Sequence, residues 1–156
     1  MTYPPGDPAS ALGLYVHFPW CVAKCPYCDF NSHSLRGDLP EDDYVAALIA
    51  EVKRVPAPVS ERNITSIFFG GGTPSLFGPA NLARLLAAIR QHLNLAGNAE
   101  ITLEANPGAI EHGNFSGYLD AGINRLSLGA QSFNAEQLRR LGRIHSVDDI
   151  TSAYTE

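Results

Sequence analysis

Short apolar runs of strand length alternate four times with segments of helical periodicity along this chain. The runs cover residues 12–18, 64–69, 100–106 and 123–131, and the helical segments cover about 40–52, 82–93, 115–120 and 134–141. Strands that alternate with helices favour a parallel sheet with right-handed crossovers, either open or closed as a barrel. Because four such units are too few for a full barrel, we expect a partial parallel α/β barrel, incomplete at its C-terminus.

Several residues predict where the helices begin and end. The acidic residues at 41–43 suit the first turn of a helix that Pro56 should stop. Residues 97–98 are expected to close the second helix, and Gly122 is expected to cap the third. The pattern at 146–149 predicts the start of another helix, which is expected to run to the end of the sequence.

The composition is that of one globular domain. The chain has 156 residues, of which 45% are hydrophobic and 17% charged. We expect a leader at residues 1–11 and one core domain over 12–156.

The net charge of -5 and the lack of a basic run argue against binding to nucleic acid. No stretch approaches the roughly 20 apolar residues of a membrane span and no signal peptide is evident, so we expect a cytoplasmic protein.

All three cysteines lie in one loop, directly after the first predicted strand. Cys21, Cys25 and Cys28 have CxxxCxxC spacing. Three clustered thiols argue against a disulfide framework and suit a reducing compartment. A structural zinc ion takes four protein ligands, whereas an iron–sulfur cubane on three cysteines leaves one iron open for another ligand. A zinc site completed by His17 or His33 is the alternative.

Distinctive polar residues follow the other three predicted strands. The glycine run at 70–74 follows the second strand, Glu104 and Asn106 end the third, and Gln131 ends the fourth. Because the carboxyl ends of parallel strands meet at one edge of a sheet, we expect these residues beside the cysteine loop. The glycine run is either a flexible turn or a place where a ligand approaches the backbone closely, and its position after a strand favours the second.

Together, these motifs resemble those of the radical S-adenosylmethionine (SAM) superfamily. The motifs are Cys21-x-x-x-Cys25-x-x-Cys28, Gly70-Gly71-Gly72-Thr73-Pro74, Glu104-x-Asn106-Pro107 and Leu126-Ser127-Leu128-Gly129-Ala130-Gln131-Ser132-Phe133. Within the superfamily, Tyr15-Val16-His17-Phe18-Pro19-Trp20-Cys21 resembles the branch that contains oxygen-independent coproporphyrinogen III oxidase and the heme chaperone HemW. The resemblance implies a partial barrel of the radical SAM type, with residues 12–156 as the N-terminal part of its core domain.

The resemblance also implies two cofactors. A [4Fe–4S] cluster would be held by the three cysteines, and its open iron would bind the amino and carboxylate groups of SAM. An electron from a donor such as flavodoxin would then cleave SAM to methionine and a 5′-deoxyadenosyl radical. The family's contacts to this SAM correspond to Tyr15, Gly71 and Glu104. The positions that face a second SAM in the oxidase correspond to Tyr27, Gly72, Thr73, Gln131 and Arg143.

One residue distinguishes the two members of this branch. The oxidase has a further cysteine two residues after the third, and this chain has Phe30 there. The difference favours the heme chaperone, which binds heme and delivers it to target proteins. The oxidase, or another radical SAM enzyme of tetrapyrrole metabolism, is the alternative, and a zinc-stabilised binding domain is a third. No catalytic residue is assigned, and the implied partners are SAM, heme or porphyrin, and an electron donor.

Overall fold

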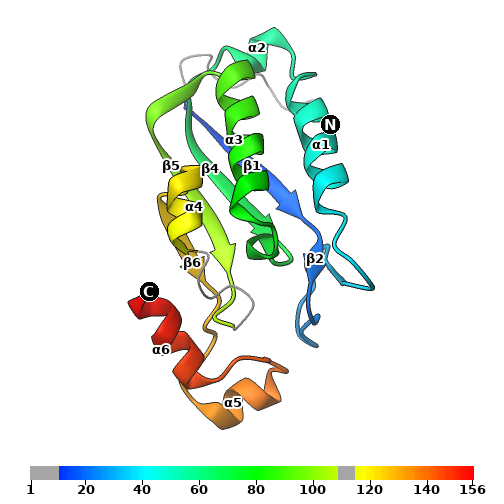
Figure 1. The fold of residues 1–156 in the computed structure, drawn as a ribbon, viewed down its shortest axis with the longest axis vertical. Coiled ribbons are helices and arrows are strands. Elements are labelled where there is room, and N and C mark those ends of the chain that lie inside the picture. The colour runs from blue at the N-terminus through cyan, green and yellow to red at the C-terminus, as the bar shows by residue number, and fades with distance from the viewer. Residues whose placement is uncertain (1–10, 109–114) are drawn as a thin grey trace.

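A four-stranded parallel sheet forms the centre of the computed structural model, which describes residues 11–108 and 115–156 (Figure 1). Its strands, in spatial order, are β1 (Leu12–Phe18), β4 (Ile64–Gly71), β5 (Leu95–Ala105) and β6 (Arg125–Leu128). Every pairing is parallel. The predicted parallel α/β fold is therefore confirmed, whereas the expected leader lies outside the described residues, apart from Ala11.

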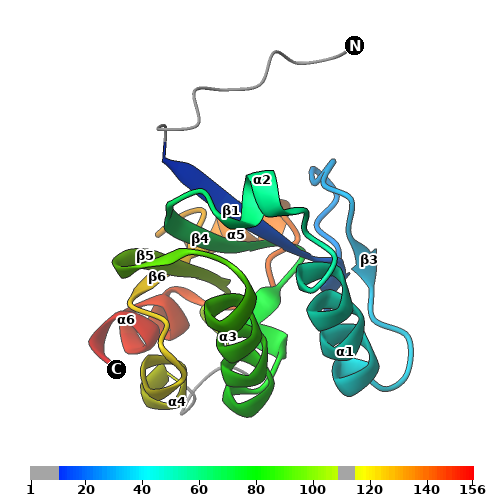
Figure 2. The same ribbon diagram turned by 90° about the horizontal axis from the view of Figure 1, so that it is seen from above.

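Three helices cover one face of this sheet, as Figure 2 shows from above. They are α1 (Glu41–Val52), α3 (Pro79–His92) and α4 (Phe115–Ala121). Alternate strand residues such as Phe18, Phe69 and Leu103 pack against this layer and are fully buried, together with Leu82 and Leu86 of α3. Burying a side chain of this size contributes about 1.5–3 kcal/mol, so this layer holds the strands in place.

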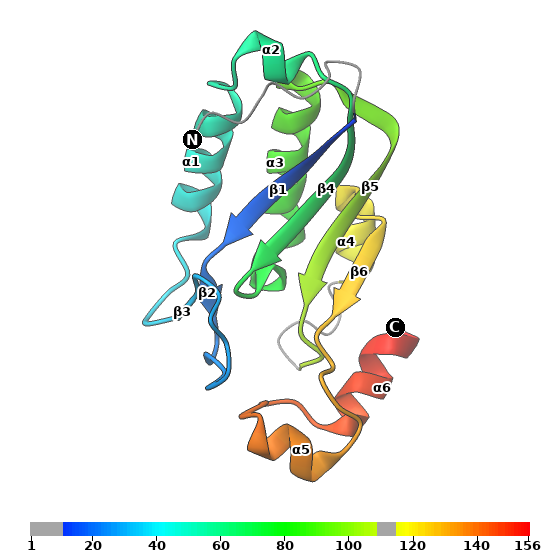
Figure 3. The same ribbon diagram turned by 180° about the vertical axis from the view of Figure 1, so that it is seen from behind.

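The opposite face of the sheet is polar and more open. In Figure 3, which shows the molecule from behind, the four strands lie in front of the three helices. Tyr15 of β1 is 56% exposed, and Arg125 of β6 forms an ion pair of 3.2 Å with Glu100 of β5. Parallel sheets usually have both faces covered, so this open face suits the inner surface of a partial barrel.

The helix α1 begins at Glu41, as the sequence predicts, whereas α3 begins at Pro79, earlier than the segment expected from about residue 82. The carboxylate of Glu41, at the start of α1, accepts a hydrogen bond of 2.6 Å from the Gly78 N–H at the start of α3. The helix α1 ends at Val52 before Pro56, and a short helix, α2 (Ala57–Ser60), follows that proline. Pro56 is the N-cap of α2, with an extended ψ of 150°. Pro58 lies in the first turn of α2, where its missing N–H has no helical acceptor to lose.

Two predicted boundaries are wrong. Gly97 and Asn98 do not close α3, which ends at His92; they lie inside β5 because pairing with β4 extends the strand back to Leu95. The fourth strand is shorter than predicted and ends at Leu128. The chain beyond it turns away, and Gln131 adopts a left-handed φ of 64°.

The remaining elements lie at the carboxyl edge of the sheet (Figures 1 and 3). They are β2 (Trp20–Cys21), β3 (His33–Ser34), the 3₁₀ helix η1 (Pro74–Leu76), α5 (Ala135–Arg140) and α6 (Val147–Thr155). The predicted start of α6 is confirmed by a capping box between Ser146 and Asp149. Gly122, with φ of 105°, follows α4 as predicted.

No helix among the described residues is long and apolar enough to cross a membrane.

Candidate functional site

The cysteine loop is held at both ends by a small parallel sheet. Cys21 of β2 pairs with Ser34 of β3, and Trp20 pairs with His33. The Cys28 N–H donates to the Cys25 carbonyl at 3.0 Å, which closes a turn between the last two thiols. All three cysteines are free and partly exposed. The loop therefore presents three unpaired thiols from an ordered backbone.

Lys24 orders this loop from within. Its ammonium donates to the carbonyls of Phe30 (3.0 Å) and Ser32 (2.9 Å), and its backbone N–H donates to Ser34. Ser32 is buried, and its hydroxyl lies 3.9 Å from the Cys28 sulfur. Sequence reasoning missed both residues, because a lysine and a serine near cysteines resemble ordinary surface residues and only the folded loop shows their contacts.

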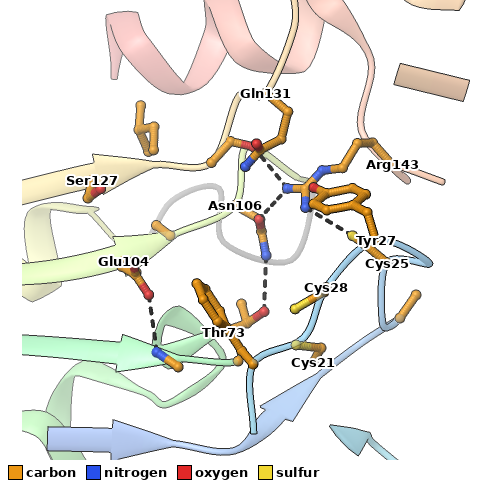
Figure 4. A pocket seen from close by; sticks show the side chains of 17 residues that line it. Cys21, Cys25, Tyr27, Cys28, Thr73, Glu104, Asn106, Ser127, Gln131 and Arg143 are labelled. Atoms are coloured by element: carbon orange, nitrogen blue, oxygen red, sulfur yellow. Dashed lines mark hydrogen bonds between the residues drawn. The ribbon is translucent and has the colours of Figure 1, made fainter. Parts of the chain in front are cut away.

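One cavity of about 340 Å³ joins the cysteine loop to the ends of β4, β5 and β6 (Figure 4). All three cysteines line it. So do all but one of the other predicted site residues, namely Tyr27, Gly71, Gly72, Thr73, Glu104, Gln131 and Arg143. Phe30, Asn106 and Ser127 line it as well. The prediction that these loops meet at one edge of the sheet is confirmed, and the volume is in the range of a small-molecule site.

Tyr15 is the predicted residue outside this lining. It lies on the open face of the sheet, where its ring stacks on Phe68 at 6.3 Å and approaches Gly70. Its hydroxyl is 3.0 Å from Nδ1 of His17. Burial and the negative charge of nearby Glu104 raise the pKa of Tyr15. The tyrosine thus borders Glu104 from the side of β1.

The glycine loop is shaped by its own packing. A Cβ on Gly72 would lie 2.5 Å from the Trp20 carbonyl oxygen, and one on Gly71, whose φ is 118°, would lie 2.6 Å from the His17 ring. The backbone N–H groups already have acceptors within the protein: Gly71 donates to Glu104, Gly72 to Phe18 and Thr73 to Trp20. Close contacts with His17 and Trp20 therefore leave no room for a side chain at Gly71 or Gly72.

Glu104 is half-buried at the end of β5. One carboxylate oxygen accepts a hydrogen bond of 3.1 Å from the Gly71 N–H. Burial raises the pKa of Glu104, and the hydrogen bond from Gly71 opposes this by favouring the charged form. The carboxylate retains further lone pairs that can accept from a ligand hydroxyl or ammonium group.

Arg143 links three of the loops around the cavity (Figure 4). It donates to the Cys25 sulfur at 3.2 Å, to the Gly129 carbonyl at 2.9 Å and to the side-chain oxygen of Asn106. Asn106 in turn donates to the Thr73 hydroxyl at 3.0 Å. By sequence alone Arg143 resembles a surface charge, and the role of Asn106 was not predicted, because its partners are 33 and 37 residues away.

Tyr27 lies beside the same thiol. Burial, followed by a hydrogen bond with Cys25, raises the pKa of Tyr27, and the positive charge of Arg143 opposes the shift. The side chain is 49% exposed. It therefore borders the cavity mouth and shields the thiols only in part.

None of the histidines within residues 11–108 and 115–156 joins the cysteines in a metal-binding group. Both ring nitrogens of His17 are engaged, Nδ1 with Tyr15 and Nε2 with the Asn31 carbonyl at 2.8 Å. His33 lies exposed on β3. His145 is buried, with Nε2 3.1 Å from the Ala130 carbonyl. The zinc alternative would require His17 to give up its present partners.

The donor set fits an iron–sulfur cluster better than one ion. Three soft thiolates are the ligands that iron–sulfur clusters take. Within residues 11–108 and 115–156, no three or more His, Cys, Asp and Glu side chains are placed to hold a single metal ion. Cysteines that ligate different irons of a cubane do not have to converge on one point.

Comparisons with known proteins agree with this geometry. A family model described as the radical SAM superfamily matches residues 15–155. Heme chaperone HemW of Haemophilus influenzae is 51% identical over 146 residues, which are 91% of this chain and 38% of that protein. HemW of Escherichia coli is also 51% identical, over 142 residues, with the same two shares.

A solved structure shows the same fold. The coproporphyrinogen III oxidase HemN from Escherichia coli, described as a radical SAM enzyme, is 32% identical with a TM-score of 0.84. The match covers 95% of this chain and 34% of that one. The chain thus spans 38% of the length of the HemW relatives it matches. Because the family model covers nearly all of the sequence, the chain belongs to the radical SAM superfamily.

Proposed function

We propose that Cys21, Cys25 and Cys28 hold a [4Fe–4S] cluster and that the adjoining cavity binds SAM. The observation that carries this proposal is the convergence of three free thiols with Glu104 and the glycine loop in one cavity. A bound cluster of this kind supplies the electron that cleaves SAM. The chain's own residues bind and orient the two cofactors and limit the access of water.

The proposed SAM contacts are Tyr15, Gly71 and Glu104. Glu104 is suited to accept from a ribose hydroxyl, because a carboxylate can take several hydrogen bonds and only one is made to Gly71. The N–H groups of Gly71, Gly72 and Thr73 already donate within the protein, so the glycine loop can offer a ligand its carbonyl oxygens. These oxygens would accept from an ammonium group of the ligand. Tyr15 would border this ligand beside Glu104.

A second ligand position is proposed on the Arg143 side of the cavity. The residues that would face it are Tyr27, Gly72, Thr73, Gln131 and Arg143. The left-handed backbone of Gln131, unusual for a residue other than glycine, supports a functional role for this turn. A second SAM, as the resemblance implies for the oxidase, is the proposed ligand.

For the whole protein, we propose a heme chaperone that delivers heme to target proteins. Phe30 supports this proposal, because its side chain lines the cavity where the oxidase motif has a cysteine. The identity to HemW supports it as well. An electron donor such as flavodoxin and a reducing, cytoplasmic setting are part of the proposal, since free thiols must stay reduced to bind iron.

Coproporphyrinogen oxidation is the second candidate, favoured by the structural likeness to HemN. The full-length protein, reconstituted with its cluster, should be incubated anaerobically with coproporphyrinogen III, SAM and reductant, and separately titrated with heme. The chaperone proposal predicts heme binding and no decarboxylated porphyrinogen. Repeated turnover of coproporphyrinogen would establish the oxidase instead.

The cluster ligands are tested by replacing each cysteine with serine. Each of Cys21→Ser, Cys25→Ser and Cys28→Ser should lose most of its bound iron and sulfide after anaerobic reconstitution. Val22→Ala, an exposed change in the same loop, is the matched control and should keep them. Full iron and sulfide in any serine variant would remove that cysteine from the ligand set.

A further inference from the structure

We infer that Arg143 is a positioning residue that stabilises the reduced cluster through a charged hydrogen bond to the sulfur of Cys25. The inference rests on the proposed cluster and adds a function for an arginine otherwise proposed to face a second ligand. It starts from the 3.2 Å contact between Nη1 and the Cys25 sulfur.

The guanidinium group is held in one orientation. Besides the sulfur, it donates to the Gly129 carbonyl, which follows β6, and to Asn106, which follows β5. Asn106 is oriented in turn by Thr73, which follows β4. An arginine with acceptors in three separate segments is pre-organised, unlike a surface arginine that samples many rotamers.

The segment that carries Arg143 is docked on the cysteine loop at a second point. Gly142, with φ of 67°, packs so closely on this loop that a Cβ there would lie 2.8 Å from the Pro26 ring. The Arg143 backbone N–H donates to the Leu138 carbonyl at 2.9 Å, which fixes the turn after α5. The link between α5 and α6 therefore holds Arg143 against the loop through backbone packing as well as through the side chain.

Two of the thiols, those of Cys25 and Cys28, differ in the charge of the group they contact. Cys25 faces the guanidinium cation of Arg143, whereas the sulfur of Cys28 lies 3.9 Å from the neutral Ser32 hydroxyl. Arginine stays protonated at every physiological pH. The positive charge of Arg143 therefore lies against one ligand of the proposed cluster, the sulfur of Cys25.

The direction of its effect follows from charge. Reduction adds an electron to the cluster and increases the negative charge on its cysteine sulfurs. A cation that donates an N–H to such a sulfur favours the more negative state, and hydrogen bonds to sulfur and net charge are known to set cluster potentials. Arg143 should therefore make the cluster easier to reduce.

The test compares midpoint potentials of reconstituted variants by EPR-monitored redox titration without SAM. In Arg143→Met, the equilibrium constant for reduction should fall at least tenfold, which is a downward shift of about 59 mV for one electron. Arg143→Lys keeps the charge but loses the three-way fork, so its potential should lie between those of Arg143→Met and the wild type. Arg140→Gln is the matched control: this arginine is exposed and pairs with Glu136, and its loss should leave the potential unchanged.

The iron and sulfide content of each protein distinguishes a failure of the proposed cluster from a failure of the inference about Arg143. A wild-type protein that takes up no cluster would overturn the proposed function. A wild-type cluster whose potential is unchanged in both Arg143 variants would overturn the inference alone. If Arg143→Met does not retain its cluster, the shift in Arg143→Lys decides, and a value equal to that of Arg140→Gln contradicts the inference.

Discussion

Burial and hydrogen bonding shift the pKa of Glu104 in opposite directions, because burial raises it and the hydrogen bond from Gly71 lowers it. Its carboxylate is half-buried, accepts from Gly71 and borders the ring of Tyr15. A ligand that offers hydroxyl or ammonium donors would complete its hydrogen bonding. Glu104 is therefore where loss of one side chain should most clearly weaken SAM binding.

Glu104→Gln should reduce the affinity for SAM roughly tenfold. The amide keeps the shape but loses the charge, and a hydrogen bond to a charged group contributes about 1.5–3 kcal/mol. Calorimetric titration of the reconstituted protein with SAM measures the change. Glu100→Gln, on the same strand but exposed, is the control and should bind SAM as the wild type does. Equal losses in both variants would contradict a direct contact by Glu104.

Glu104 should also give the free energy of unfolding a pH dependence. Its pKa in the folded protein lies above the ordinary value of 4.5. Between 4.5 and that raised pKa, the folded chain therefore binds more protons than the unfolded chain, and its stability falls as the pH rises. Urea unfolding at several pH values should show this fall in the wild type and a flatter profile in Glu104→Gln. Parallel profiles for the two proteins would refute it.

At the scale of the elements, the glycine loop and the cysteine loop support each other. The Gly72 N–H donates to Phe18 at 2.6 Å, and the adjacent Thr73 N–H donates to Trp20 at 2.7 Å. These bonds continue the pairing of β1 and β4 to the start of the cysteine loop. The position of the thiols thus depends on how closely the two backbones approach.

Gly72→Ala should therefore destabilise the protein by about 1–3 kcal/mol, as overpacking does. The new methyl group would meet the backbone of Trp20, which cannot move as a flexible side chain would. Urea unfolding of the apo protein measures the loss. Gly97→Ala is the control, because nothing lies within 4 Å of a Cβ there. Equal free energies of unfolding in the two variants would show that a methyl group at residue 72 is accommodated without a clash.

Sequence patterns predicted the elements better than their boundaries. The strand at Leu12–Phe18 and the helix starts near Glu41 and Ser146 follow local rules of alternation and capping, and all are confirmed. Gly97 and Asn98 favour a turn locally, but pairing with β4 draws them into β5. Tertiary contacts of this kind have no local signal in a single sequence.

At the scale of the whole molecule, the sheet has two edge strands in the described part of the chain, β1 and β6. The parallel order, and the gathering of the loops at one edge, could be predicted because α/β sheets place strand ends together. The thiol contacts could not, since Arg143 reaches Cys25 across 118 residues.

Hydrogen exchange on residues 1–156 should reflect this strand order. Amides of β4 and β5, which pair on both sides, should be the most protected, and those of β6 should exchange markedly faster because only β5 pairs with it among the described residues. Exchange monitored by mass spectrometry or NMR measures the difference. Equal protection in β4 and β6 would show that the outer edge of β6 is paired in solution.

Anaerobic reconstitution followed by EPR of the reduced protein, with and without SAM, tests whether the three cysteines and the adjoining cavity hold a cluster and SAM. We expect a brown protein with the iron and sulfide of one [4Fe–4S] cluster per chain, whose reduced EPR signal changes when SAM is added. A chain that binds zinc in place of iron and sulfide, or a cluster whose signal is the same with and without SAM, would contradict this expectation.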